Sequence, residues 1–287
     1  MKIHLFKRLA KYYLNFLFSF LISSYSFAQE RWFQIELSIF SNENIEDRNA
    51  ESWLPSDYEL NYPKNMRKLS LLTDLFLSDH NLDGRLSVTG SASQEEIDAM
   101  IRNDQLKNIR PRIKSTESNF KLFDFSRNDF TQLSPVDSDF QQTNRTLERS
   151  SDHRLLYHGL WRQAVRQSSN AVPIYIEGGL RYGDNHELQG SVTIRFNENE
   201  DRVVVDTHIW LIEYSIVKDS SSEWKLPQIP ESIRRESREN SSSLTYFPNN
   251  VYVMEQSREM RSNEFHYLDH PALGLVISVK PYSVPSR

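Results

Sequence analysis

The chain has 287 residues, of which 38% are hydrophobic, 25% charged and 12% aromatic. This length allows one large domain or two small ones, and the aromatic content argues against wholesale disorder. The formal net charge of −5 repels nucleic acid and anionic lipid, so neither is an expected partner. The chain has no cysteine, which excludes a disulfide framework, a thiolate nucleophile and a cysteine metal site.

The N-terminus has the pattern of a secretory signal peptide. It begins with four basic side chains, which are those of Lys2, Lys7, Arg8 and Lys11. An apolar run over residues 12–22 follows, and Ser26-Phe27-Ala28 places small residues at positions −3 and −1 of a cleavage site before Gln29. The run is short for a transmembrane helix, although an uncleaved anchor remains the alternative. Removal of residues 1–28 takes away four basic residues and no acidic one, which leaves 30 basic and 39 acidic residues and a net charge of −9. We expect export to the periplasm.

Alternating apolar and polar residues predict strands at the start of the mature chain and through its second half. The expected strands are Trp32–Phe40, His153–Trp161, Val172–Ile176, Leu188–Phe196, Val203–Tyr214 and Val251–Met254. A turn over Asn197–Glu200 joins two of them and predicts a β-hairpin. In the last strand Leu273, Leu275, Ile277 and Val279 share one face.

Two helices are expected after the first strand. Apolar residues recur at helical spacing over Met66–Ser78. A capping box at Ser93–Glu96 begins a second helix, which must end by Arg110 because Pro111 follows. The predicted fold class is α+β, a mainly antiparallel sheet of about six or seven strands with two or more helices inserted after the first strand.

The predicted domain organisation is a signal peptide over residues 1–28 and a single domain over residues 29–287. Insertions are expected near residues 41–151 and 218–248. Within them, Ser41–Pro63 is a loop anchored by Trp53, and Ser115–Ser151 is a polar excursion whose phenylalanines hold it to a surface. Lys218–Pro248 is a solvated insertion rich in serine, proline and charge.

The segment Asp79–Ser87 matches the first two-thirds of a calcium loop, with oxygen-bearing side chains at Asp79, Asn81 and Asp83. The bidentate glutamate expected at position 12 is Gly90. An Asx-rich turn is the alternative, because Asp-Gly sequences form turns without a metal.

His266, Asp269, His270 and Pro271 form a compact motif before the last strand. Two histidines on one face of a helix would suit a metal, but Pro271 opposes a helix, and in an extended segment residues 266 and 270 lie about 13 Å apart. We therefore predict no metal site and interpret the motif as a turn locked by its own hydrogen bonds.

No enzymatic signature emerges. The chain has no Gly-x-Ser-x-Gly nucleophile elbow, and neither a Gly-x-Gly-x-x-Gly sequence nor a P-loop indicates a cofactor. Binding is better suited to the residues present. Trp161 could stack on a sugar ring, and Arg162, Arg258 and Arg261 could engage carboxylates. The alternative is that Trp161 is a core residue and that the arginines solvate an edge strand.

Four stretches carry a resemblance to a known family: RWFQIE from Arg31 to Glu36, LLYHGLWRQ from Leu155 to Gln163, THIWL from Thr207 to Leu211, and SREMRS from Ser257 running into HYLDHP at His266–Pro271. Together they resemble the CsiV family of periplasmic peptidoglycan-binding proteins of Gram-negative bacteria. The sequence departs from the family pattern at Ala164, where a proline is expected.

The resemblance implies a non-catalytic envelope protein that binds peptidoglycan or the cell-wall synthesis or divisome machinery and supports cell shape. Glycan rings would contact Trp161 or Tyr267, and stem-peptide carboxylates would contact Arg258 and Arg261. Two alternatives remain: a protein–protein adaptor that binds no glycan, and a cell-wall hydrolase.

Overall fold

The computed structural model describes residues 30–70, 126–218, 224–234 and 244–285. The chain divides into two compact units, Met1–Arg31 and Trp32–Arg287, and the description below concerns the second. The predicted signal peptide, the predicted helix that begins at Ser93 and the calcium-type loop lie outside the described residues. Among the described helices, none is long and apolar enough to cross a membrane.

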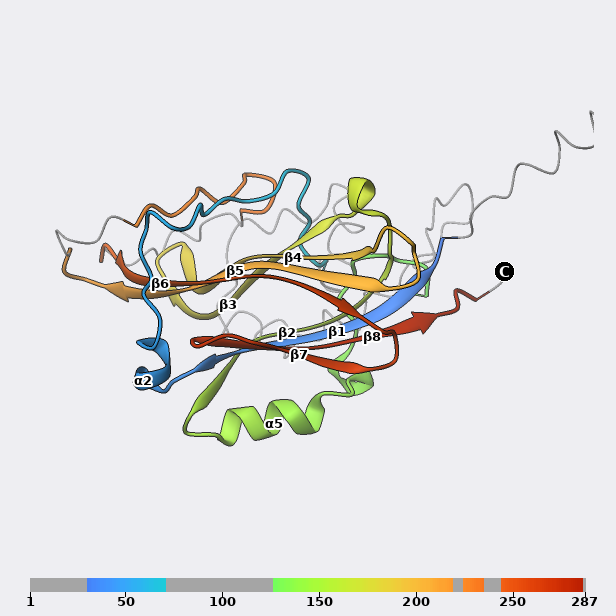
Figure 1. Ribbon diagram of the computed structural model, residues 1–287, viewed down its shortest axis with the longest axis horizontal. Coiled ribbons are helices and arrows are strands. Elements are labelled where there is room, and N and C mark those ends of the chain that lie inside the picture. The colour runs from blue at the N-terminus through green and yellow to red at the C-terminus, as the bar shows by residue number, and fades with distance from the viewer. Residues whose placement is uncertain (1–29, 71–125, 219–223, 235–243, 286–287) are drawn as a thin grey trace, which may run out of the picture. The chain divides into compact units, whose positions relative to one another are not determined.

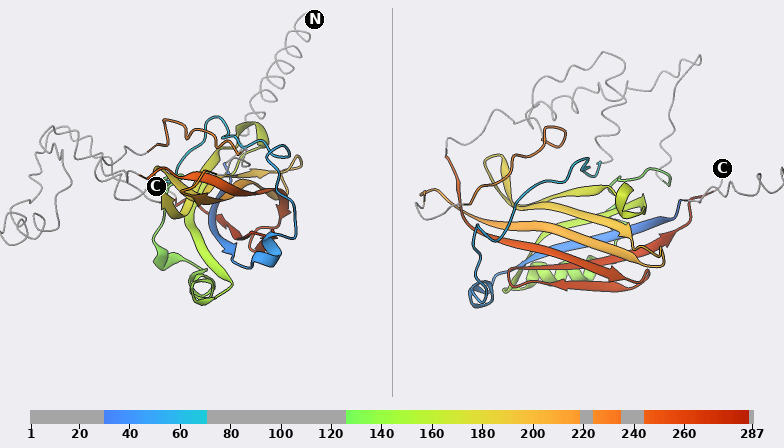
Figure 2. Two further views of the ribbon diagram at one scale, coloured as in Figure 1. Left: turned by 90° about the vertical axis from the view of Figure 1, so that its left-hand side faces the viewer. Right: turned by 45° about the horizontal axis from the view of Figure 1, so that its top comes forward.

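Eight strands form two four-stranded antiparallel sheets in the described part of the chain. Their bounds are β1 (Trp32–Asn42), β2 (His153–Ala164), β3 (Pro173–Tyr182), β4 (Asn185–Phe196), β5 (Val203–Ser215), β6 (Phe247–Met260), β7 (Phe265–Asp269) and β8 (Leu273–Tyr282). The first sheet has the order β2-β1-β8-β7 and the second the order β3-β4-β5-β6. The two sheets lie one above the other as layers (Figures 1 and 2).

The core of this sandwich consists of side chains from the facing sides of both sheets. In β8 the four predicted apolar positions, Leu273, Leu275, Ile277 and Val279, are at most 1% exposed. They pack in one cluster with the alternate residues of β1, β4 and β5. Full burial of each such side chain contributes about 1.5–3 kcal/mol, and the alternation predicted from the sequence is confirmed.

The predicted hairpin is also confirmed, since β4 and β5 pair from Phe196 opposite Val203 onward. All six strands predicted with bounds are longer in the structure, and β3 and β6 gain the most residues. β3 continues beyond Gly178 through a register irregularity, and β6 begins at Phe247 and ends at Met260. Their added residues are mostly polar or exposed because β3 and β6 end the second sheet, where alternation in the sequence is weak.

The start of the predicted helix Met66–Ser78 is wrong. Arg67 forms a parallel bridge with Ile174 of β3, and Ser70 forms one with Thr131. Gln132 in turn bridges to Trp161 of β2. Two short extended segments therefore lie between β2 and β3 and join one side of the two sheets. The remainder of the predicted helix lies outside the described residues.

The described helices are few and short. They are the α-helices α2 (Ile45–Arg48) and α5 (Gln141–Arg149) and the 3-10 helices η3 (Pro135–Asp137) and η4 (Ser168–Asn170). α5 lies against the outer face of the first sheet, within the predicted polar excursion (Figure 1). Its sequence, QQTNRTLER, has no apolar stripe, so helical periodicity could not reveal it. The fold is mainly β, and the α+β description holds only in part.

The outer face of the second sheet carries its own apolar cluster, made of Trp210, Ile212, Val251 and Val253. Trp224 and Leu226, from the region predicted to be a solvated insertion, pack on this cluster. That prediction is wrong for residues 224–234, because an apolar cluster on the outer face of β5 and β6 needs a cover. Trp53 packs as the predicted anchor, with its ring 5.8 Å from that of Tyr252.

Two glycines with positive φ provide a matched test of the packing. At Gly190 (φ 134°) an added Cβ would lie 2.3 Å from the backbone oxygen of His208 on β5, whereas at Gly183 (φ 63°) it would meet no atom within 4 Å. We expect Gly190→Ala to lower the free energy of unfolding by about 3 kcal/mol or more and Gly183→Ala by about 1 kcal/mol, measured by urea unfolding. Equal effects would contradict the close contact between β4 and β5.

Candidate binding site

The motif singled out in the sequence lies where the chain passes from one sheet to the other. β6 ends the second sheet, a turn at residues 261–264 follows, and β7 forms the edge of the first sheet. β7 and β8 form a hairpin in which Asp269 faces Gly274. In its turn the amide of Leu273 donates to the oxygen of His270 at 3.3 Å, with Pro271 in the second position that favours proline.

His270 connects this corner to the second sheet. Its Nδ1 accepts a hydrogen bond from the amide of Ala272 at 3.2 Å, so the proton is on Nε2, which donates to the backbone oxygen of Val253 on β6 at 3.1 Å. The ring is 9% exposed and lies 4.8 Å from the Trp53 ring. Burial lowers the pKa of His270 from 6.5 to about 4, so the imidazole is neutral at physiological pH.

Tyr267 presents a half-exposed aromatic ring that is held in a fixed position. The ring is 52% exposed and stacks on Phe40 with a centroid distance of 6.2 Å and an interplanar angle of 4°. Its hydroxyl donates to Asp269 at 2.7 Å. Burial and the neighbouring Asp269 carboxylate raise the pKa of Tyr267, so the phenol stays protonated. The ring is therefore ready to pack against a flat ligand surface.

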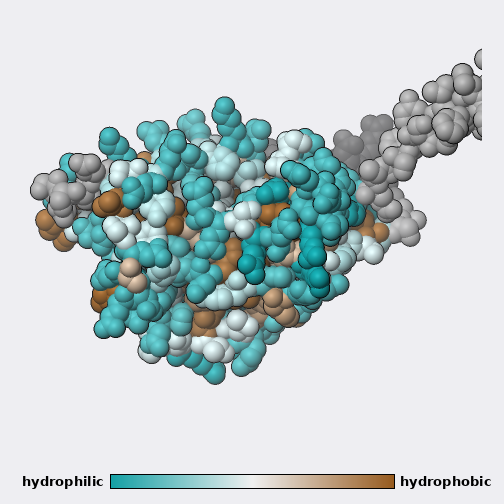
Figure 3. Space-filling view, viewed as in Figure 1, coloured by the Kyte–Doolittle hydropathy of each residue, from teal (hydrophilic) through white to brown (hydrophobic). Residues whose placement is uncertain are grey.

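The predicted arginines of this region are at the surface. Arg258 lies opposite Val205 in the β5–β6 pairing, and both Arg258 and Arg261 are exposed. The face seen in Figure 3 is mainly hydrophilic, with scattered hydrophobic patches. His266 lies 3.6 Å from Glu264, and Pro271 accepts a hydrogen bond from Asn42 through its backbone oxygen. In the described parts of the chain, no group of three or more His, Asp or Glu side chains could hold a metal ion.

Trp161 does not lie where a sugar ring could reach it. It is 0% exposed, belongs to the core between the sheets and donates through Nε1 to Gln163 at 2.8 Å. The predicted ligand contact at Trp161 is therefore not supported, because its position on β2 points inward with the apolar residues.

Arg162, the next residue, points to the outer face of the first sheet. It donates to Gln34 at 3.2 Å, and its guanidinium lies 4.1 Å from the centroid of the Tyr282 ring. β2 and β7 are the outer strands of this sheet, and the strand registers place Arg162 about 20 Å from Tyr267 on the same face. The predicted binding residues therefore do not form one cluster.

A buried carboxylate on that outer face was missed in the sequence. Glu36 is 2% exposed and accepts hydrogen bonds from His158 Nε2 (2.9 Å), from the hydroxyl of Ser138 and from the amides of Asp139 (2.9 Å) and Phe140 (3.1 Å). Burial raises the pKa of Glu36, but these hydrogen bonds outweigh it and the net pKa is lowered. Glu36 thus holds the segment before α5 against the sheet.

A chain of alternating charges was also missed. Glu213 pairs with Arg48 at 3.0 Å, Arg48 with Glu43 at 3.2 Å and Arg154 with Glu43 at 3.3 Å, and Arg154 forms a two-pronged pair with Glu187. Because Glu187 and Glu213 belong to the second sheet, the chain connects both layers at one end of the sandwich. Residues spread over 170 positions give no local signal of such a network.

A wide pocket of about 510 Å³ adjoins this network, lined by Glu43, Glu148, Ser150, Ser151, His153, Arg154 and Leu155. His153 contacts Phe40 edge-on at 5.3 Å, and Phe40 stacks on Tyr267. Three rings therefore run from the pocket to β7 across the outer face of the first sheet. Tyr267 is thus connected to the pocket through two ring contacts, which the sequence did not reveal.

The family model described as "Peptidoglycan-binding protein, CsiV" matches residues 9–282. The chain belongs to the CsiV family. The resemblance stated from the four sequence stretches is thereby confirmed, and the match includes all eight strands, since β8 ends at Tyr282. Comparison with curated proteins and with solved structures found no match.

In this CsiV-family chain the His270 hydrogen bond gives a pH-dependent contribution to stability. The folded-state pKa of about 4 lies below the ordinary value of 6.5, so the unfolded chain takes up a proton first as the pH falls. We expect the contribution to be complete above pH 6.5 and to decline by up to about 3 kcal/mol between pH 6.5 and 4. Urea unfolding at a series of pH values measures it.

The matched variants are His270→Ala and His270→Gln. The alanine variant should lose about 2 kcal/mol at pH 7, because the Val253 oxygen and the Ala272 amide both lose a buried partner. Glutamine can still donate to Val253 and does not titrate, so it should retain more stability and flatten the profile between pH 6.5 and 4. An unchanged pH profile in both variants would refute the role of His270 as the connection between the sheets.

The buried Glu36 provides a second stability test. In Glu36→Gln one carboxylate oxygen becomes an NH₂ group that cannot accept a hydrogen bond, and the other oxygen loses its charge, so we expect a loss of about 3 kcal/mol in the free energy of unfolding. Ser38→Ala is the control, because Ser38 makes a single neutral hydrogen bond to Asn144 at 2.7 Å and should cost about 1 kcal/mol. Similar losses in the two variants would show that Glu36 does not fix α5 through its charge.

Proposed function

We propose that this protein is exported to the periplasm and binds peptidoglycan there without catalysing a reaction on it. Membership of a family described as peptidoglycan-binding, over nearly the whole chain, is the observation that carries the proposal. Export rests on the signal-peptide pattern of residues 1–28.

The exposed residues of the β6–β7 corner support direct contact with the polymer. A half-exposed Tyr267 ring, held parallel to Phe40, is suited to stacking on a saccharide ring. Peptidoglycan also carries carboxylates on its stem peptides, and a mature chain with net charge −9 repels these unless cations face them. Arg258 and Arg261 supply such cations, and arginine binds carboxylates in a two-pronged geometry.

A second candidate function is a protein–protein adaptor of the envelope, for example one that binds cell-wall synthesis or divisome proteins. β6 and β7 each end their sheet, and Phe265 on β7 is 62% exposed, so this side offers strand edges and an apolar side chain to a partner. Crosslinking in cells discriminates between the candidates: the adaptor predicts one abundant protein partner whose capture survives digestion of the wall.

Sedimentation with insoluble peptidoglycan sacculi tests direct binding. The chain from Gln29 onward should pellet with sacculi at low salt, and Arg258→Ala combined with Arg261→Ala should lower the affinity about tenfold, as should Tyr267→Ala. Arg181→Ala is the matched control, because its exposed arginine lies on β3, away from the corner.

Protein that remains in the supernatant, while a known wall binder pellets, would refute direct binding. An equal loss in Arg181→Ala and in the corner variants would show that the interaction depends on overall charge rather than on this site. Release of soluble wall fragments by the purified protein would instead support the hydrolase alternative.

A further inference from the structure

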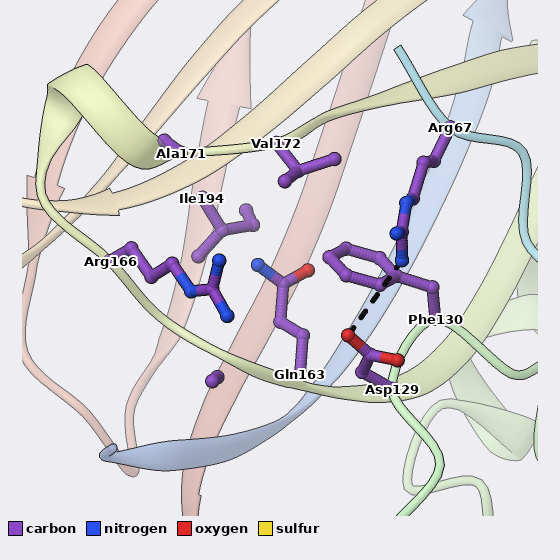
Figure 4. Close-up of a pocket in the computed structure, with 9 residues that line it drawn as sticks. Arg67, Asp129, Phe130, Gln163, Arg166, Ala171, Val172 and Ile194 are labelled. Carbon is purple, nitrogen blue, oxygen red and sulfur yellow. Dashed lines mark ion pairs between the residues drawn. The ribbon is translucent and has the colours of Figure 1, made fainter. Parts of the chain in front are cut away.

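A second, enclosed pocket lies at the side of the sandwich that the short bridging segments join. It has a volume of about 80 Å³ and is lined by Arg67, Asp129, Phe130, Gln163, Ala164, Arg166, Ala171, Val172 and Ile194. In Figure 4 the side chains of Arg67 and Arg166 enter from opposite sides, and Gln163 lies between them. None of the residues predicted for binding lines it.

The orientation of the Gln163 amide follows from its partner. Gln163 is 1% exposed, and Trp161 Nε1, which can only donate, bonds to its Oε1 at 2.8 Å. The NH₂ group must therefore be the other end of the amide, and Figure 4 shows it directed into the pocket, on the side of Arg166 and Ile194. A buried donor aimed into a pocket favours an acceptor there.

The lining also supplies charged donors that an anion can use. Two guanidinium groups and one carboxylate line the pocket. Asp129 lies 3.8 Å from Arg67 in a pair whose side chains are about half exposed, so it offsets one cation only weakly. Arg67 is further held over the Phe130 ring at 5.1 Å, which fixes its direction.

The size and the remaining wall restrict the anion. A water molecule occupies about 30 Å³ in the liquid, so the pocket holds a group of only a few heavy atoms. The rest of the wall is apolar, with two alanines, Val172, Ile194 and Phe130. A carboxylate next to a small apolar side chain fits both the polar and the apolar parts of this lining. The donors would bind the carboxylate oxygens, and a methyl group would pack against the apolar wall.

We propose that this pocket binds the terminal carboxylate of a short peptide whose last side chain is small, such as alanine. The inference deepens the proposed function and rests on it, because the stem peptides of peptidoglycan would supply such an end. It assigns carboxylate recognition to Arg67, Gln163 and Arg166 rather than to the arginines of the β6–β7 corner.

A titration followed by NMR tests the proposal on the chain from Gln29 onward. The probes are N-acetyl-D-alanyl-D-alanine and its C-terminal amide, which differ only in the carboxylate. We expect saturable shifts of the Gln163 side-chain NH₂ and of the amides of Ala164 and Val172 with the acid, and at least tenfold weaker binding of the amide. Absence of shifts at these positions, or equal binding of the two probes, would overturn the inference.

Two variants act on the pocket in different ways. Arg166→Met removes one cation, and Ala171→Phe fills the apolar wall while leaving every donor in place. Each should weaken binding of the acid at least tenfold, whereas Arg181→Met, an exposed arginine of β3, should leave it unchanged. Unchanged binding in both pocket variants, with thermal melting as in the original chain, would also overturn the inference.

The two proposals can fail separately. If the chain pellets with sacculi but the peptide acid does not perturb the pocket, the pocket inference fails and peptidoglycan binding stands. If the peptide acid binds in the pocket but sacculi leave the chain in the supernatant, the proposed function fails and the pocket remains a carboxylate site.

Discussion

The hydrogen bond from His270 to Val253 lies on the side of the sandwich where β6 and β7 end their sheets. The structure pairs β6 with β5 and β7 with β8, and among the described strands no ladder pairs β6 with β7. Side chains join the two layers there instead: His270 bonds to β6, and Gln256 of β6 donates to the backbone oxygen of Asp269 at 2.8 Å. Two apolar faces can stay buried against each other only if such an edge is prevented from opening.

The opposite side of the sandwich is joined by backbone. Arg67 and Ser70 bridge from β3 to the strand-like segment at residues 130–132, which in turn bridges to β2. Because these segments are short, they do not fill the space between β2 and β3 completely. The pocket at Gln163 is the space that remains, so the carboxylate site follows from the way in which this fold closes its second edge.

The sequence predicted what depends on local periodicity and could not predict what depends on distant partners. Alternation identified most of the strand residues and the β4–β5 hairpin, since one buried face imposes a period of two. Helical periodicity failed at Met66 and Leu69, where apolar residues three apart belong to a bridging segment, and at α5, whose contact with the sheet rests on a buried carboxylate at Glu36. Glu36 and α5 are about a hundred residues apart, so no local pattern links them.

The same reasoning explains the mixed result for the candidate site. Exposure of Arg258 and Tyr267 agrees with their edge strands, but Trp161 has the inward position of β2 and lies in the core, as its apolar neighbours do. The remaining binding groups are separated. Arg162 lies about 20 Å from Tyr267 on the outer face of the first sheet, and the Gln163 pocket lies on the side of the sandwich that the bridging segments join. A small ligand could reach only one of these places, whereas a polymer of repeating sugars and peptides can contact several at once. Separate weak contacts then add through effective concentration, which makes a dispersed set of sites consistent with binding to a polymeric wall.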